Sequence, residues 1–186
     1  MSFLSAHELA QLGLQAYGDN VLISAKASLY NCARISIASN VRIDDFCVLS
    51  AGEGGIRIGS FVHLGVGATL LGAGTITMCD FSGLSSRVAV YSSSDDYSGN
   101  HMTNPTVPAE LTRVKTSDVF IGRHVIVGCG SVILPGSILE EGVAVGALAL
   151  VQKRCEAFTI QSGVPAVKVK ERSRKLLELE RQFFSS

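Results

Sequence analysis

Aliphatic residues recur at every sixth position along much of this chain. In the second half the run is unbroken, with Ile121, Val127, Ile133, Leu139, Val145 and Val151. Earlier stretches keep the spacing: Ile23, Leu29, Ile35, Val41 and Cys47, then Ile58, Leu64, Leu70 and Ile76, then Met78, Leu84 and Val90 in a shifted phase. Neither the period of about 3.6 residues of a helix nor the period of two of a simple strand produces this repeat. A hexapeptide repeat predicts a parallel β-helix of short strands and tight turns.

The repeat also predicts the shape of each coil. Six residues make one flat side, the repeating aliphatic residue points inward, and three sides close a triangular coil of about 18 residues. Glycine follows several inward residues, as at Gly122, Gly128 and Gly146. We expect these glycines at corners whose backbone conformation is costly for other residues. The phase slips near residues 52–55 and 72–74, where extra residues should bulge from a corner.

The segments outside the repeat divide a single domain into parts. Within an N-terminal cap, 1–20, the run Ser5-Ala6-His7-Glu8 fits a capping box and predicts a helix over about 5–13 that closes one end of the prism. Residues 21–91 and 119–155 form the β-helix. Residues 92–118 break the period and are polar, which predicts an extruded loop with a function. Residues 156–186 form a C-terminal extension, with a charged helix over about 170–184.

Composition excludes several classes of protein. The 16 basic and 16 acidic residues balance, so nucleic acid is not an expected partner. No apolar run reaches the ~18 residues of a membrane span, and the start lacks the features of a signal peptide. Five cysteines without a Cys-x-x-Cys pair predict free thiols and a cytoplasmic location. Val66, Ala68 and Val88 are expected on outer faces, and a three-sided prism with apolar faces most simply forms a homotrimer.

Motifs in the second half carry a family resemblance. They are the segment from Ile121 to Gly136 (IGRHVIVGCGSVILPG), then Val145-Gly146-Ala147, then Gly163-Val164-Pro165-Ala166. These resemble the hexapeptide-repeat acyltransferases, in the branch of maltose, galactoside and nodulation-factor O-acetyltransferases, and in a subgroup near polysaccharide synthesis. The resemblance implies a left-handed β-helix, a trimer with its sites between subunits, and transfer of an acetyl group from acetyl-CoA to a sugar hydroxyl or amine. It implies no metal.

The acceptor needs a group that removes its proton as it attacks the thioester. The resemblance places this base in the extruded loop, where His101 is the candidate and Asp95 stands near the usual histidine position. Histidine suits the role because its pKa lies near the working pH. Asp95 would need a pKa raised by burial. Alternatively, Asp95 or Asp96 orients His101.

Other polar residues are candidates for the substrates. In the loop Tyr97, Asn100 and Asn104 could bind sugar hydroxyls of a sugar or nucleotide-sugar, or could only shape the loop. His63 faces outward by alternation, and Asp80 follows Met78-Cys79, where turn capping is the plain alternative. For CoA, the resemblance suggests close backbone approach at Gly128, Gly130, Gly146 and Ala147, a lining of Val164, Pro165 and Ala166, and phosphate contacts from Lys168, Lys170 and Arg172.

Two other functions share this fold. One is a zinc carbonic anhydrase, whose metal is held by three histidines from adjacent subunits and for which His63, His101 and His124 would be the candidates. The other is a non-catalytic β-helix scaffold that has lost its base. We favour a sugar O-acetyltransferase of O-antigen or capsule synthesis, with the hydroxyl preferred over the amine.

Overall fold

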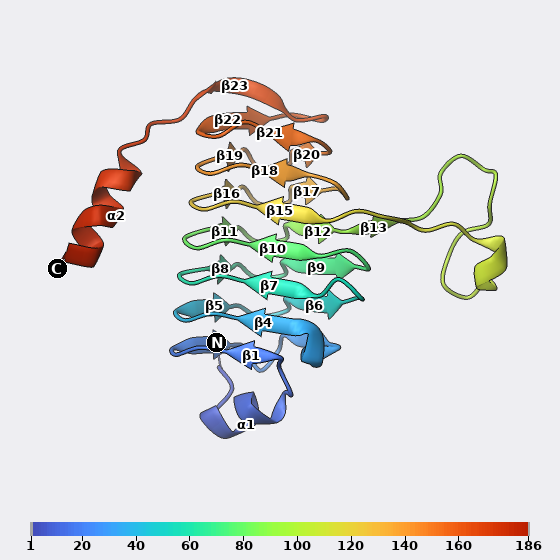
Figure 1. Cartoon of the computed structure of the whole chain (residues 1–186), viewed down its shortest axis with the longest axis horizontal. Helices are drawn as coiled ribbons and strands as arrows, with labels where there is room; N and C mark the ends of the chain where they lie inside the picture. Colours follow the sequence, from blue (N-terminus) through green and yellow to red (C-terminus); the bar gives the residue numbers. More distant parts are fainter. Residues whose placement is uncertain (1, 186) are drawn as a thin grey trace.

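The computed structural model describes residues 2–185 and is a tall prism of stacked triangular coils, a left-handed parallel β-helix (Figure 1). Its strands form three sheets, one on each side of the prism. The first sheet contains β1 (Ala16–Tyr17), β4 (Ile35–Ile37), β7 (Ile56–Ile58), β10 (Ile76–Met78), β15 (Val119–Ile121), β18 (Ile138–Leu139) and β21 (Arg154–Cys155). The fold class is therefore confirmed.

The other two sides are built in the same way. The second sheet contains β2 (Val21–Ile23), β5 (Val41–Ile43), β8 (His63–Leu64), β11 (Gly83–Leu84), β16 (Ile126–Val127), β19 (Ala144–Val145), β22 (Thr159–Ser162) and β23 (Val167–Glu171). The third contains β3 (Ser28–Tyr30), β6 (Val48–Ala51), β9 (Thr69–Gly72), β12 (Ala89–Tyr91), β17 (Val132–Ile133) and β20 (Leu150–Val151). Neighbouring strands are parallel, except that β23 folds back antiparallel on β22 and covers the last coil.

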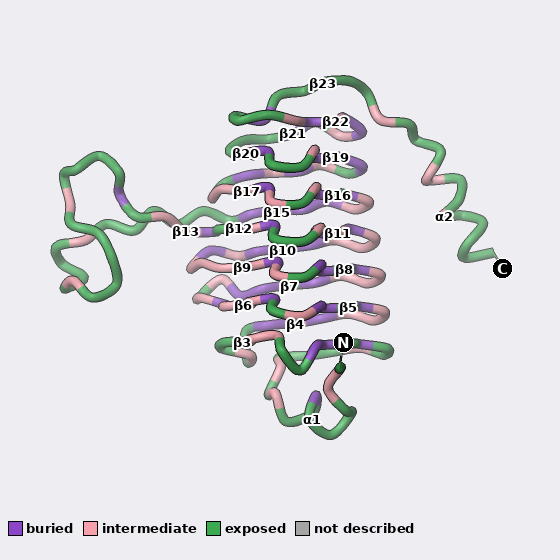
Figure 2. Tube along the Cα trace, turned by 180° about the vertical axis from the view of Figure 1, so that it is seen from behind, coloured by how far each residue is buried: buried purple, intermediate pink, exposed green. Residues whose placement is uncertain are grey.

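The predicted inward positions stack in register through the prism. On the third sheet Leu70, Val90, Ile133 and Val151 are paired from coil to coil, and each is at most 1% exposed. Figure 2 shows this buried interior running up all the coils. A one-residue slip would turn the whole stack to solvent, so burial sets the register.

A second inward position per side corrects one expectation about the surface. Of the three residues expected outside, only Val66 is exposed, while Ala68 and Val88 are fully buried. Both lie two residues before a stacking aliphatic residue, at the start of a side, and alternation along the strand directs them inward as well.

The glycines that follow inward residues have a different role from the one expected. Gly122, Gly128 and Gly146 do not have positive φ; the left-handed corners are occupied instead by residues such as Phe61, Phe81, His124 and Leu148. A Cβ on Gly122 would lie 2.8 Å from the Leu139 carbonyl oxygen in the next coil. These glycines are needed because the backbones of successive coils approach closely there.

The two ends of the chain close and brace the prism. Helix α1 (Ala6–Gln11) begins with the predicted capping box, in which the Ser5 amide donates to the Glu8 carboxylate (2.8 Å) and Ser5 Oγ accepts from the Glu8 amide (3.3 Å). Helix α2 (Leu176–Ser185) is shorter than expected, because residues 167–171 pair with β22 as β23.

A hairpin leaves the prism between the two β-helix blocks. Its stem is β13 (Ser93–Ser94) paired antiparallel with β14 (Lys115–Thr116). The segment between them, which includes the 3-10 turn Ala109–Leu111, projects far from the coils (Figure 1) and is largely exposed (Figure 2). A similar turn, Cys32–Arg34, lies in the first block. The extruded loop is therefore present where the period breaks.

Candidate active site

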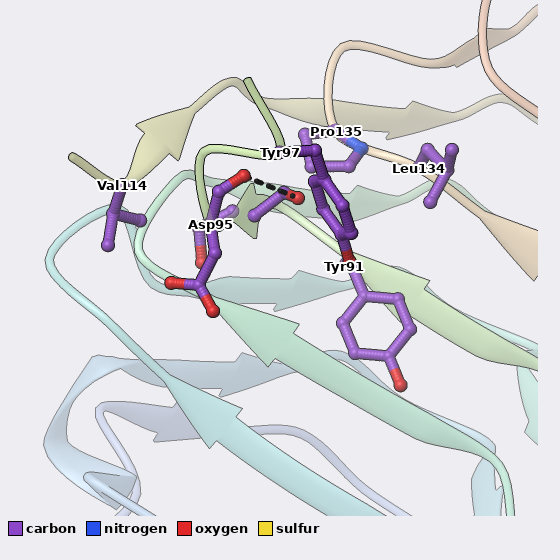
Figure 3. Close-up of a pocket in the computed structure, with 8 residues that line it drawn as sticks. Tyr91, Asp95, Tyr97, Val114, Leu134 and Pro135 are labelled. Atoms are coloured by element: carbon purple, nitrogen blue, oxygen red, sulfur yellow. Dashed lines mark hydrogen bonds between the residues drawn. The ribbon is translucent and has the colours of Figure 1, made fainter. Parts of the chain in front are cut away.

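A pocket of about 520 Å³ opens where the hairpin leaves the prism. It is lined by Tyr91, Ser93, Ser94, Asp95, Tyr97, Val114, Leu134 and Pro135, and we call it the hairpin pocket. In Figure 3 the Asp95 carboxylate and the Tyr91 ring face the same opening, with Tyr97 beside Tyr91 and Leu134 and Pro135 behind. One wall is therefore aromatic and apolar, and one carboxylate faces it.

The Asp95 side chain makes no hydrogen bond or ion pair with the described residues. The backbone carbonyl of Asp95 accepts a hydrogen bond from Ser94 Oγ (3.2 Å). The residue is exposed in a single chain, so its carboxylate is open to solvent. The carboxylate is an open acceptor for a ligand N–H or ammonium group.

The neighbouring Asp96 is, by contrast, buried and fully engaged. Its Oδ2 lies 2.8 Å from His101 Nδ1 and 2.8 Å from Ser98 Oγ, its Oδ1 accepts from the Ser98 amide (3.1 Å), and Lys115 Nζ lies 3.5 Å away. Hydrogen bonds from His101 and Ser98 hold the pKa of this carboxyl far below its ordinary value. Asp96 therefore orients His101, one of the two alternatives that the sequence left open.

The pairing places His101 within the loop rather than in the hairpin pocket. Its side chain is one-third exposed, and of the described residues it is not one that lines that pocket. Because the ionised Asp96 accepts from Nδ1, the Nε2 atom carries the lone pair. His101 therefore has the oriented imidazole that a base requires, but it lies outside the pocket that Asp95 lines.

The other loop candidates divide between ligand-facing and structural positions. Tyr97 is 91% exposed and lines the hairpin pocket. Asn104 has φ of 77°, and its Oδ1 accepts from the amide (3.0 Å) and hydroxyl (2.6 Å) of Thr106, so it shapes a turn. The Asn100 amide donates to Ser98 Oγ (3.3 Å), and its exposed side chain remains a candidate for substrate contact.

A second polar site lies on the face of the second sheet. A pocket of about 300 Å³, here called the corner pocket, is lined by Asp44, His63, Gly65, Gly83, Leu84, Ser85, Ser86 and Ile126. His63 Nε2 lies 2.8 Å from Asp44 Oδ2, and Arg42 Nε donates to Asp44 Oδ1 at 2.7 Å. Sequence inspection identified His63 but missed Asp44, although Asp44 follows the inward Ile43 directly and so stands at a corner beside β8.

A shallow groove continues around the same edge of the prism. It encloses about 390 Å³ and is lined by Val66, Ser86, Arg87, Cys129, Gly130 and Leu148. Ser86 belongs to both this groove and the corner pocket. Gly130 thus lies where a ligand could run along the coils, whereas Gly128 and Gly146 face the backbone of Ala147 and the side chain of Ser162, and their absent Cβ atoms serve coil stacking.

The remaining predicted CoA residues lie on the last strands. Val164 is 70% exposed beside Pro165, and Ala166 is buried. Lys168 is paired with Glu171 (2.6 Å) and Glu156 (3.4 Å) on the surface. Arg172 is half-buried, and its Nη1 donates to the carbonyls of His124 (2.8 Å) and Gly142 (3.0 Å). That nitrogen is committed to bracing β23 against a corner, which argues against Arg172 as a phosphate ligand.

Asp80 and His124 have structural partners. Asp80 Oδ1 accepts from the Ser60 amide at 2.7 Å, so it caps a turn of the neighbouring coil, as the plain alternative held. His124 Nε2 lies 2.7 Å from Glu180 on α2, and burial lowers the pKa of the imidazole. His63, His101 and His124 are thus each bonded to a different carboxylate. Among residues 2–185 no group of three His, Cys, Asp or Glu side chains is arranged to hold a metal ion.

No protein-family model matches the chain, but single relatives do. An Escherichia coli dTDP-4-amino-4,6-dideoxy-D-glucose acyltransferase is 54% identical over 183 residues, which cover 98% of this chain and 95% of the relative. The chain belongs to the hexapeptide-repeat acyltransferases. It is an enzyme of acyl transfer, and the family resemblance found in the sequence is confirmed.

Solved structures of other acyltransferases agree. AntD, an N-acyltransferase from Bacillus cereus, is 46% identical in complex with dTDP and 3-hydroxybutyryl-CoA, with a TM-score of 0.92 over 99% of this acyltransferase and 97% of its own chain. Its serine-to-alanine mutant in complex with dTDP-4-amino-4,6-dideoxyglucose and coenzyme A is also 46% identical, with a TM-score of 0.94 over 99% and 98% of the two chains. A maltose O-acetyltransferase from Clostridium difficile 630 has a TM-score of 0.63 at 18% identity over 90% of this chain and 75% of its own, which shows the shared fold.

In the described part of this acyltransferase no helix has the length and apolarity to cross a membrane.

Proposed function

We propose that the enzyme transfers an acyl group from a CoA thioester to the amino group of a nucleotide-linked sugar, of the dTDP-4-amino-4,6-dideoxyhexose class. The observation that carries the proposal is the open carboxylate of Asp95 in the hairpin pocket, in a chain so similar to acyltransferases of dTDP-linked amino sugars. The proposal replaces the hydroxyl preferred from the sequence with an amine.

The chemistry of the pocket favours an amine. A hydroxyl is a poor nucleophile at neutral pH and needs a strong proton acceptor at the moment of attack. A neutral amine attacks a thioester without such help and then has to lose one proton. An exposed carboxylate such as Asp95 can hold an amine through its N–H groups, and its negative charge favours a cationic amino sugar over a neutral one.

The AntD structures support a role for this pocket. They include variants of one aspartate and of one serine that lies ten residues before it. This chain has the same spacing at Ser85 and Asp95, and again at Ser86 and Asp96. Both serines line the corner pocket, and both aspartates lie at the hairpin. We infer that the hairpin pocket and the corner pocket serve one reaction.

The two pockets share no lining residue in one chain, so we propose that they meet between subunits of a homotrimer. The outer face of the third sheet supports side-by-side packing because its outward strand residues carry no charge: Ser28, Tyr30, Val48, Ser50, Thr69, Leu71, Ala89, Tyr91, Val132 and Leu150. The hairpin leaves the prism beside this face and would reach a neighbouring subunit. The groove past Gly130 and Leu148 would then receive the pantetheine arm of CoA, with the Val164–Ala166 segment beyond it.

The cellular compartment and the pathway class are inferred from the cysteines and the substrates. All five cysteines are free thiols, which supports a reducing compartment and hence the cytoplasm. A nucleotide-linked amino sugar is an activated building block, so the product would serve synthesis of a surface polysaccharide such as an O-antigen. Acetyl is the simplest donor group, and 3-hydroxybutyryl is a second candidate because AntD has been crystallised with 3-hydroxybutyryl-CoA.

The direct test incubates the enzyme with acetyl-CoA or 3-hydroxybutyryl-CoA and dTDP-4-amino-4,6-dideoxyglucose. Free CoA and acylated sugar are measured by chromatography and mass spectrometry, because the exposed Cys129 would react with a thiol dye. The control acceptor carries a hydroxyl in place of the amine. We expect amide formation with the amine only; acylation of the hydroxyl analogue at an equal rate would contradict the proposal.

The shared site is tested by subunit complementation. Asp95→Asn and Ser85→Ala are each expected to be weak enzymes. If one site uses Asp95 of one subunit and Ser85 of its neighbour, randomly mixed trimers regain about a quarter of intact sites. Mixtures that stay as inactive as the separate variants would place both residues in one chain's site.

A further inference from the structure

The His63–Asp44 pair is built as an oriented imidazole. The Asp44 carboxylate is 7% exposed, with Arg42 Nε on one oxygen (2.7 Å) and His63 Nε2 on the other (2.8 Å). Burial on its own would raise the pKa of this carboxyl, but the hydrogen bonds from Arg42 and His63 outweigh it and the pKa lies below the ordinary value. Asp44 is therefore ionised and can only accept hydrogen bonds.

This fixes which nitrogen of His63 carries the proton. Because the carboxylate accepts from Nε2, the neutral ring is protonated there and Nδ1 presents a lone pair. Within residues 2–185 no hydrogen bond is made by Nδ1, and 55% of the side chain is exposed. A free lone pair, backed by a buried anion that stabilises the imidazolium, is the arrangement of a general base.

The surroundings leave room for a ligand at this nitrogen. In the sheet, Gly83 lies beside His63 and has no side chain, and Ile126 follows on the next strand. Ser85 and Ser86 complete the wall, and Ser86 also lines the groove that leads past Gly130. Arg42 and Asp44 are the charged groups that face the ring. The imidazole thus stands where the corner pocket opens towards the proposed thioester path.

We propose that His63, oriented by Asp44, is the proton acceptor of the acyl transfer; this inference rests on the proposed function. The sugar nitrogen forms a bond to the thioester carbonyl carbon, and the carbon–sulfur bond breaks. The proton that the nitrogen loses passes to His63 Nδ1, and the imidazolium then gives this proton to the departing CoA thiolate, which leaves as the free thiol and restores the neutral imidazole. Asp95 of the neighbouring subunit holds the amine through its other N–H.

His101 is the competing candidate, because Asp96 orients it in the same way. Two observations favour His63. It lines a pocket shared with the two serines that match the AntD spacing, and that pocket adjoins the groove along the coils. His101 lies in the projecting loop outside the hairpin pocket. Under this inference, His101 stabilises the loop through Asp96 and takes no part in proton transfer.

The experiment compares His63→Gln, Asp44→Asn, His101→Gln and the control His7→Gln. His7 is an exposed histidine on α1, bonded to Gln11. Loss of a general base typically costs about a hundredfold or more in rate. We expect that loss in kcat for His63→Gln with the thermal shift by CoA retained, a smaller loss for Asp44→Asn, and full activity for His7→Gln. His101→Gln loosens the hairpin that carries Asp95, so it should lower the rate, but far less than His63→Gln does. Added imidazole should restore part of the activity of His63→Ala, which a merely structural role would not allow.

Several results would overturn the inference. They are a wild-type rate for His63→Gln, a loss confined to His101→Gln, or a His63→Ala enzyme that imidazole does not rescue. Failure of the proposed function is visible separately, since it concerns which acceptor the wild-type enzyme uses. Whichever acceptor is acylated by the wild type is the one used for the variant series.

Discussion

Replacing Gly128 with alanine is expected to destabilise the prism in the absence of any ligand. A Cβ there would lie 2.5 Å from the Ala147 nitrogen, 2.7 Å from the Gly146 carbonyl carbon and 2.9 Å from Ala147 Cα. The obstruction is backbone of the next coil, which β16 and β19 hold in a parallel ladder, so it cannot swing aside. Two close-packed coils would have to separate by roughly 1 Å.

Overpacking of this kind costs about 1–3 kcal/mol, and an immobile neighbour favours the upper value. For a chain of this size each kcal/mol lowers Tm by about 2–4 °C, so a fall of about 6–12 °C is expected. Thermal and urea unfolding are followed at one protein concentration, because assembly contributes to stability. The matched control is Gly83→Ala, since the nearest atom to its added Cβ is the His63 carbonyl oxygen at 3.6 Å.

The comparison discriminates between two roles of the glycine. If Gly128→Ala and Gly83→Ala unfold at the same temperature as the wild type, the coils do not stack as described. The glycine at 128 would then be explained by close approach of CoA, as the sequence first suggested. Weakened CoA binding with unchanged stability of the free enzyme would be the signature of that role.

Three further predictions test the core, the hairpin and the C-terminal helix. Val127→Asp places an unpaired charge at a fully buried stacking position. Circular dichroism and size-exclusion chromatography of this variant should show no folded assembly. The control Ile126→Asp, on the exposed side of the same strand, should fold. The pKa of Asp96 is depressed, chiefly by the hydrogen bond from His101. The stabilisation that the ionised Asp96 gives the hairpin is therefore complete above the unfolded pKa of about 3.9 and is lost progressively as pH falls from that value towards the lower folded-state pKa. Hydrogen exchange of residues 95–101 should speed up over that range, and Asp96→Asn should exchange fast even at pH 6. Glu180→Gln weakens the contacts of α2 with Arg123 and His124. Hydrogen exchange of α2 should therefore speed up, while the free energy of unfolding of the prism stays within about 1 kcal/mol of the wild-type value. A simultaneous loss of protection in α2 and of prism stability would mean that α2 is part of the folding unit.

Much of the fold was predictable because its signal is local and repeated. Each coil buries the same inward position, so the six-residue period carries the topology, and the break at 92–118 marks the hairpin. The capping box at Ser5 was predictable for the same reason, since both its hydrogen bonds join residues three apart. The strand at 167–171 was missed because its pairing with β22 is made only after the chain reverses, and its charged residues also suit an exposed helix.

The candidate site could be predicted from the sequence only in part. Asp95, Asp96, Tyr97 and His101 were selected by their position in the extruded segment, but sequence spacing could not say which aspartate binds the histidine. Asp44 was missed because its partner His63 lies 19 residues away, one coil further on, and the two meet only when the coils are stacked. The contacts of Arg172 Nη1 with the carbonyls of His124 and Gly142 were also missed, because these residues lie far from Arg172 in the sequence.

By itself, the sequence determined the architecture: the period of its aliphatic residues requires a β-helix, because only that fold buries every sixth residue along one line. The class of reaction came from the resemblance of its second-half motifs to a family, and not from the period. Tertiary structure alone decided which polar groups are occupied and which are free. Asp96 and Arg172 are engaged by residues brought near by folding, whereas Asp95 and the Nδ1 atom of His63 are left open. That difference depends on contacts between coils and across the hairpin, since hydrogen bonds are formed by distance in space and not by position along the chain.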